Sequence, residues 1–329
     1  MNTFADADVD FDLYAKAHPE HAHVLPASSY VGAVIDRMYG SKSDAGHLLP
    51  WSKTHANFRM RPGEVTIWAG VNGTGKSVLL NQIILNVMRD GGTACIASME
   101  MKPVATLARM TRQAAGSARP SNEYVMALHE WMDNKLWMYD QQGTVKPNRM
   151  LGVLRYCHAG VFGRYQFTNR SGEVVVCENP EKDRIRINHF VIDSLMKCGI
   201  NSDDYNRQKS FVDELCNHAR DTGVHIHLVA HARKGESSRG HVDKFDIKGA
   251  SEISDLVDNV FSVWRNKGKE DESQKQTPDA EVMGQPCATL TCSKQRHGEW
   301  EGKINLWFDR ASMQYVAGDG LRPIEYFGG

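Results

Sequence analysis

The segment Gly70–Ser77, which reads GVNGTGKS, constrains the fold of this 329-residue chain more than any other. It fits the pattern G-x-x-x-x-G-K-[ST] in full, between the apolar run Val65–Ala69 and the helical pattern of Ser77–Met88. In that context glycines let backbone N–H groups surround phosphate oxygens, and the helix N-terminus adds positive potential. We therefore predict a phosphate-binding loop in which Lys76 neutralises the β- and γ-phosphates and Ser77 ligates Mg²⁺. The residues expected to bind the nucleotide are Gly70, Asn72, Gly73, Thr74, Gly75, Lys76 and Ser77.

Buried strands alternate with helices beyond this loop. Apolar runs predict strands at 93–98, 136–139, 188–193, 225–230, 259–264, 287–293 and 303–308. Helical periodicity predicts helices at 103–116, 121–134, 147–158 and 204–221. This alternation indicates an α/β fold with a mainly parallel sheet that helices cover, and it places the site at the carboxyl ends of the strands.

Three polar residues follow or end these strands. Asp193 ends the run HFVID and is a Walker B candidate for Mg²⁺; the alternative is an aspartate that caps the next turn. Glu100 follows the strand at 93–98, where a carboxylate can orient the attacking water, although its position alone favours a solvated surface residue. His231 ends the run HIHLVAH and is interpreted as a group that senses the γ-phosphate. Zinc binding on the face shared by His225, His227 and His231 is disfavoured, because no cysteine or carboxylate cluster completes a site.

The chain is expected to consist of an arm and one large domain. Residues 1–44 are weakly patterned and form an arm or linker, with a short amphipathic helix at 28–39 that packs either on its own domain or on a neighbouring subunit. Residues 45–329 form the domain, and 161–187 is predicted to be a hairpin inserted into it. The charged stretch 267–280 is predicted to be a solvated loop.

Composition limits the classes of protein that the chain can represent. The 39 basic and 40 acidic residues give a net charge of −1, which excludes a uniformly basic nucleic-acid binder but not a local basic path. No apolar run is long enough to span a membrane, and the acidic start lacks the basic region of a secretory signal. The seven cysteines are odd in number and form no CxxC pair, which favours a reducing cytoplasm over a disulfide framework.

Five segments stand in an order that resembles a known family. They are GVNGTGKS, SMEM, HFVIDS and HLVAHARK, followed by SKQRHG. Over residues 45–317 the chain resembles the helicase domain of DnaB-type hexameric replicative helicases, which are RecA-like ATPases, and it looks closest to those with histidine rather than glutamine at the third motif. The resemblance implies a RecA-like core, Glu100 as the catalytic glutamate, Asp193 as the Walker B residue and His231 as the sensor. It also implies that Lys294 and Arg296 reach the next subunit's nucleotide, with Arg296 as the finger.

The resemblance also points to a DNA-binding segment. Lys248, Gly249 and Ala250 match the family's central-channel loop, and the basic stretch before it supplies Lys234 and Arg239 as weaker candidates. Because this stretch carries no aromatic residue, it favours phosphate contacts over base stacking. A ring of such subunits would concentrate positive charge in a channel, which reconciles DNA binding with a net charge of −1.

The function implied by the resemblance is an ATP-dependent DNA helicase in replication. It would move on single-stranded DNA as a homo-oligomeric ring, expected to be a hexamer running 5′ to 3′, with ATP or another NTP or dNTP and Mg²⁺. The 44 residues before the domain cannot hold a primase, so a primase or loader would be a separate partner. The competing hypotheses are a RecA-type recombination ATPase and an ATP-gated DNA-binding or loader module.

Overall fold

The computed structural model describes residues 26–39, 46–159, 164–168, 174–178, 185–201, 203–231 and 251–328. The chain divides into two compact units, Met1–Ala45 and Gly46–Gly329. In the first unit the short helices η3 (Ala27–Tyr30) and α2 (Val31–Tyr39) coincide with the predicted helix at 28–39, except that η3 begins one residue earlier. The apolar side chains of Val31, Val34, Ile35 and Met38 are exposed.

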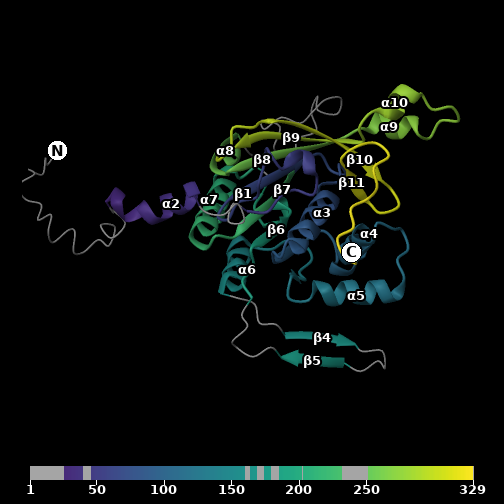
Figure 1. Cartoon of the computed structure of the whole chain (residues 1–329). Helices are drawn as coiled ribbons and strands as arrows, with labels where there is room; N and C mark the ends of the chain where they lie inside the picture. The colour runs from purple at the N-terminus through teal and green to yellow at the C-terminus, as the bar shows by residue number, and fades with distance from the viewer. Residues whose placement is uncertain are drawn as a thin grey trace, which may run out of the picture. The chain divides into compact units, whose positions relative to one another are not determined.

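The second unit contains a nine-stranded sheet in the order β11-β10-β9-β8-β1-β7-β6-β2-β3. Figure 1 labels β1 and β6 to β11 of this sheet. Its strands are β1 (Val65–Gly70), β2 (Ala94–Ser98), β3 (Leu136–Met138), β6 (His189–Asp193), β7 (His225–His231), β8 (Asn259–Arg265), β9 (Ala288–Gln295), β10 (Gly302–Asp309) and β11 (Gln314–Val316). The six strands from β8 to β3 run parallel, and β9, β10 and β11 extend the sheet beside β8 with antiparallel pairings. Central strands β1, β2 and β6 are buried along their whole length, because helices cover both faces of a parallel sheet.

The helices of this unit are η5 (Ser52–Thr54), α3 (Lys76–Arg89), α4 (Pro103–Ala115), α5 (Asn122–Met132), α6 (Pro147–Ala159), η7 (Leu195–Lys197), α7 (Tyr205–Thr222), α8 (Ser251–Leu256), α9 (Lys267–Glu272) and α10 (Ala280–Gly284). α9 and α10 project beyond the sheet, and the longer helices cover its two faces (Figure 1). Side chains of α3, α4 and α5 form one hydrophobic core, and side chains of α6, α7 and α8 form the other. The predicted RecA-like α/β architecture, a mainly parallel sheet between two helical layers, is confirmed.

Helix ends follow local sequence signals. Ser121 Oγ accepts from Tyr124 N at the start of α5, and Asp204 accepts from Arg207 N at the start of α7. Gly116 and Gly223 end α4 and α7 in the left-handed conformation that glycine adopts without steric cost.

The prediction of a loop throughout 267–280 was wrong. This stretch contains α9 and the first residue of α10. Asn266 Oδ1 accepts from Lys269 N, and Asp279 Oδ1 accepts from the N–H groups of Glu281 and Val282, so side-chain caps start both helices without an apolar face. Lys269 is also buried and donates to the backbone oxygen of Gln285.

Two strands of the inserted segment form a sheet of their own. β4 (Arg164–Thr168) pairs antiparallel with β5 (Val174–Glu178), and neither joins the nine-stranded sheet. Ile187, by contrast, is buried in the core that α6 and α7 share, although it falls within the range predicted as insert. Within the described residues, no helix is long and apolar enough to cross a membrane.

We expect the β4–β5 segment to be dispensable for folding. Replacing residues 160–184 with a short Gly/Ser linker should change the free energy of unfolding by less than about 1 kcal/mol, since loop length has only a weak entropic effect. Ile187→Ala should instead cost about 2–5 kcal/mol, because it leaves a cavity in the core. Chemical denaturation of both variants measures the difference. Failure of the linker variant to fold would contradict the prediction that this segment is dispensable.

Candidate active site

The parallel strand order brings the predicted nucleotide-site residues to one edge of the sheet, namely the edge formed by the carboxyl ends of the parallel strands. β1 leads directly into the loop at residues 70–77, and its last residue, Gly70, lies opposite His231 at the end of β7. Ser98 and Asp193 lie opposite each other at the ends of β2 and β6. Glu100 follows β2 by two residues. Parallel strands all end at the same edge, so these side chains meet.

The backbone of residues 70–75 turns sharply before α3 begins at Lys76. Gly73 and Gly75 have φ values of 81° and 92°, a region that side-chain-bearing residues rarely adopt. A Cβ on Gly75 would lie 2.2 Å from the Tyr315 hydroxyl, so a larger residue does not fit there. Lys76 is buried, and its Nζ donates to the backbone oxygens of Gly70 at 2.8 Å and Val71 at 3.0 Å. The lysine ammonium is therefore held inside the loop by the loop's own carbonyl groups.

Two further residues support this loop, and the sequence analysis did not single them out. Arg265, at the end of β8, donates from Nη1 to the Gly73 oxygen at 2.8 Å and also contacts Glu270. Tyr315 of β11 reaches the backbone oxygen of Thr74 at 3.5 Å. Both lie far from the loop in sequence, and neither belongs to a motif. Only the pairing of the antiparallel edge strands brings Tyr315 close to the loop.

Ser77 and Asp193 form the part of the site that fits Mg²⁺. Ser77 Oγ donates to Asp193 Oδ2 at 2.6 Å, and Asp193 is buried. Burial raises the pKa of the Asp193 carboxyl above its usual range. An oxygen pair of this kind suits Mg²⁺, which binds through one or two carboxylates together with substrate phosphates. The described residues contain no cluster of three His, Cys, Asp or Glu side chains that could hold a metal without such a substrate.

Glu100 and His231 meet at a third residue, Ser194. Ser194 Oγ donates to Glu100 Oε1 at 3.0 Å and lies 3.1 Å from His231 Nε2. His231 Nε2 is also 3.5 Å from Glu100 Oε1. The contact with His231 is the largest cause that lowers the pKa of Glu100 to about 2, and the Ser194 hydrogen bond adds to it. Glu100 is therefore a carboxylate at neutral pH, suited to accept a hydrogen bond from water.

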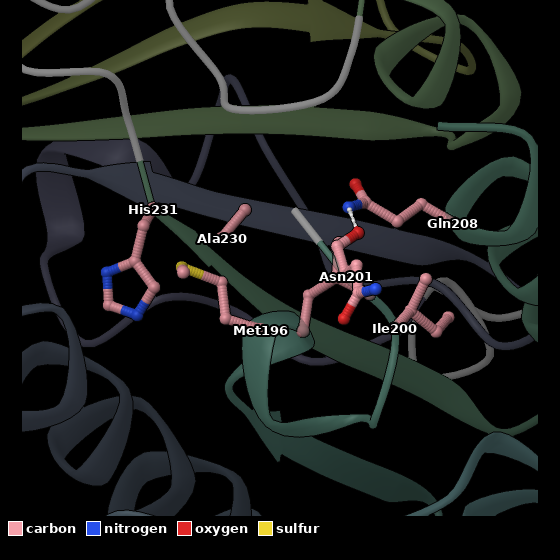
Figure 2. A pocket seen from close by; sticks show the side chains of 7 residues that line it. Met196, Ile200, Asn201, Gln208, Ala230 and His231 are labelled. Atoms are coloured by element: carbon pink, nitrogen blue, oxygen red, sulfur yellow. Dashed lines mark hydrogen bonds between the residues drawn. The ribbon is translucent and has the colours of Figure 1, made fainter. Parts of the chain in front are cut away.

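A cavity of about 240 Å³ adjoins this cluster (Figure 2). Its lining consists of Leu195, Met196, Ile200, Asn201, Gln208, Ala230 and His231. Gln208 closes one side by donating from Nε2 to the Asn201 oxygen at 2.9 Å. The same histidine that contacts Glu100 therefore also forms one wall of the cavity.

The remaining histidines of β7 have partners within the protein. His225 Nε2 lies 2.9 Å from Thr66 Oγ1, and its Nδ1 lies 2.7 Å from the Arg61 oxygen. His227 accepts from Trp68 Nε1 at 3.2 Å and lies 3.0 Å from His189 Nδ1. These hydrogen bonds use both ring nitrogens of each histidine, so the two rings act as core residues.

Lys294 and Arg296 lie at the opposite edge of the sheet from Lys76, namely the edge formed by the amino ends of the parallel strands. β9 runs antiparallel to β8, so its last residue, Gln295, lies opposite Asn259 at the start of β8. Asn259 in turn lies opposite Thr66, near the start of β1, whereas the nucleotide loop follows the end of β1. At about 3.3 Å per residue, β1 separates the two edges by roughly 17 Å.

Both cations contact the carboxyl end of α8 in the single chain. Lys294 Nζ donates to the oxygens of Ser254 and Asp255, each at 2.8 Å. Arg296 donates to the Leu256 oxygen at 3.0 Å and forms an ion pair with Asp258 at 3.3 Å. Cations stabilise the negative end of a helix, which explains this arrangement.

The predicted DNA contacts Lys234, Arg239, Lys248, Gly249 and Ala250 lie outside the described residues.

Solved structures share this fold over most of the chain. One is a DnaB-like replicative helicase whose structure was described with its interactions with primase; it matches with a TM-score of 0.65 and 14% identity, over 93% of this chain and 71% of that one. Another is the ATPase domain of G40P, with a TM-score of 0.65 and 15% identity, over 88% of this chain and 98% of that one. No protein-family model and no curated protein matches the sequence. The likeness to DnaB-like helicase domains that the motifs indicate is thus confirmed in the fold.

The pKa of Lys76 allows a test of whether the predicted loop binds nucleotide phosphates. Burial lowers the pKa of Lys76 to about 8, although Asp193 and Glu100 act in the opposite direction. Bound phosphates favour the charged ammonium, so nucleotide binding should take up roughly one proton at pH 9 and almost none at pH 7. The affinity should fall as the pH rises above about 8. Calorimetry in buffers of different ionisation enthalpy measures this uptake.

A suitable control is Lys53→Arg. Burial also lowers the pKa of Lys53, but this side chain binds the backbone oxygens of Asn305 and Ala317 instead of the nucleotide loop. Proton uptake should be unchanged in this variant. Uptake that does not vary between pH 7 and pH 9 in the wild type would contradict the placement of Lys76 against the phosphates.

Proposed function

We propose that this protein is an ATP-dependent DNA helicase that acts as a homo-oligomeric ring in replication. The observation that carries the proposal is the division of the predicted machinery between two edges of one sheet. Lys76, Ser77, Asp193, Glu100 and His231 gather at one edge, and Lys294 and Arg296 lie at the other. Such a subunit cannot bring its own Arg296 to its own nucleotide, whereas a neighbour in a ring can.

Each residue has a defined task in this proposal. Lys76 neutralises phosphate charge, and Ser77 and Asp193 hold Mg²⁺, which when bound neutralises phosphate oxygens and orients the nucleotide. Glu100, held as a carboxylate, orients the attacking water, and His231 senses the γ-phosphate. Arg296, assisted by Lys294, supplies positive charge to the neighbour's γ-phosphoryl group as negative charge builds there. The substrate is ATP or another NTP or dNTP.

DNA binding rests on residues that the structure does not describe. We propose Lys248, Gly249 and Ala250 as contacts to the backbone of single-stranded DNA, with Lys234 and Arg239 nearby. Their chemistry supports phosphate contacts that are indifferent to base identity. Ser251, the first residue of α8, directly follows Ala250, so this segment adjoins in sequence the helix that Lys294 and Arg296 contact. Ring translocation from 5′ to 3′, and a separate primase or loader, belong to the same proposal.

An unwinding assay tests the activity. With ATP and Mg²⁺, the wild type should separate a forked duplex that carries a free 5′ tail. Glu100→Gln should bind nucleotide with unchanged affinity but lose turnover by about 100-fold or more, because the amide cannot orient water as a carboxylate does. Homologous pairing without unwinding would favour a recombination ATPase. DNA binding without turnover would favour a loader module, and wild-type turnover in Glu100→Gln would refute the role of Glu100.

Mixed assemblies test the trans role of Arg296. Arg296→Ala should leave nucleotide binding by a single subunit unchanged, because its own nucleotide lies at the other edge of the sheet. Mixed with wild type, it should depress ATPase activity more steeply than its mole fraction, since each variant subunit disables a neighbour. Lys303→Ala, which removes an exposed lysine of β10, is the control. Mixed with wild type, it should not depress ATPase activity more steeply than its mole fraction. A strictly proportional decline for Arg296→Ala would count against the trans role.

A further inference from the structure

The strand order gives one residue a position between two others that the proposed mechanism requires. β6 lies between β7 and β2, and residue 194 is the first after β6. His231 ends β7, and Glu100 follows β2 by two residues. The backbone at position 194 therefore lies between the end of β7 and the segment that follows β2. In this chain the residue is a serine, which can donate one hydrogen bond and accept another.

The contacts of Ser194 use both of these capacities. Its side chain is fully buried, and its hydroxyl donates to Glu100 Oε1 at 3.0 Å. The single hydroxyl proton is then committed, so the 3.1 Å contact with His231 Nε2 requires the histidine to donate. His231 Nδ1 is buried and has no hydrogen-bond partner among the described residues, as expected when the ring proton is on Nε2. The result is a chain of two hydrogen bonds from His231 through Ser194 to Glu100.

We propose that Ser194 is a positioning residue that relays the state of the γ-phosphate sensor to Glu100. This inference rests on the proposed function and adds the residue through which two of its groups communicate. The Nε2 proton of His231 can go to Ser194 at 3.1 Å, to Glu100 Oε1, which lies farther away at 3.5 Å, or to a phosphate oxygen. When it turns to phosphate, Ser194 loses its donor, and the orientation of its hydroxyl toward Glu100 changes. Ser194 itself touches neither nucleotide nor water in this role.

Other groups face the same carboxylate. His231 Nε2 contacts it directly at 3.5 Å. Lys197 and Lys76 contribute positive charge from η7 and α3, and Asp193 contributes negative charge from β6. All of these charges remain when the serine hydroxyl is removed. A loss of turnover in Ser194→Ala therefore reports the hydrogen-bond relay, because the charge around Glu100 is unchanged.

Steady-state kinetics of three variants test the proposal. Ser194→Ala should lower kcat by about 10- to 100-fold, the range expected for one hydrogen bond to a charged group, and leave nucleotide affinity within about twofold. Ser194→Thr, which keeps the hydroxyl, should recover most of the lost rate. Ser312→Ala removes another buried serine whose hydroxyl binds a carboxylate, that of Asp309, away from the site. It should match Ser194→Ala in its loss of thermal stability and keep kcat.

A double-mutant cycle separates positioning from a general structural effect. If Ser194 acts through Glu100, Ser194→Ala should reduce the residual turnover of Glu100→Gln by less than about twofold. Multiplicative losses in the double variant would overturn the inference, and so would a wild-type kcat in Ser194→Ala. If Glu100→Gln is inactive while Ser194→Ala is fully active, the relay is refuted and the proposed function stands. If Glu100→Gln keeps the wild-type rate, the proposed function itself fails.

Discussion

The burial of adjacent parallel strands is the constraint on which the rest of this structure depends. β1, β2 and β6 are buried on both faces and mostly apolar, so they are stable only between two layers of helices. In a parallel arrangement every strand runs in the same direction. The residues that follow each strand therefore lie at the same edge of the sheet. Segments that are far apart in sequence thus supply Lys76, Glu100, Asp193 and His231 to one site. Packing, and not any direct attraction among these polar groups, brings them together.

The site places charges in low-dielectric surroundings where their partners are incomplete. Burial lowers the pKa of Lys76 and raises that of Asp193, so each group would gain from a further partner of opposite charge. A nucleotide with Mg²⁺ offers such partners, phosphate for the lysine and the metal for the aspartate. Within the chain, carbonyl oxygens of the loop hold the lysine, and Ser77 holds the aspartate. In the proposed function, this electrostatic pre-organisation would support both nucleotide binding and catalysis.

The opposite edge of the sheet carries a different set of charges. Lys294 and Arg296 there stabilise the carboxyl end of α8, and Asp258 anchors Arg296 while its other carboxylate oxygen accepts from Val65 N at 2.9 Å. The start of β1 and the proposed finger are thus fixed to the same aspartate, while the end of β1 leads into the nucleotide loop. In a ring, the proposed helicase would use both edges of each subunit, one to hold its nucleotide and one to complete the neighbour's.

The sequence by itself predicted most of the strands, the longer helices and the glycine-rich loop between β1 and α3, because hydrophobic periodicity and the glycine spacing of GVNGTGKS are local signals. It missed the helices η5, η7, α8, α9 and α10 and the strand β11, which are too short to show a clear periodicity. Glu100, Lys294 and Arg296 became candidates through a resemblance in motif order and not through local chemistry. Tertiary structure alone decided that Ser194 bridges Glu100 and His231, that Arg265 and Tyr315 support the loop, and that Lys294 and Arg296 lie at the far edge. The physical reason is that strand order and register, which a local pattern does not encode, determine which strand ends become neighbours.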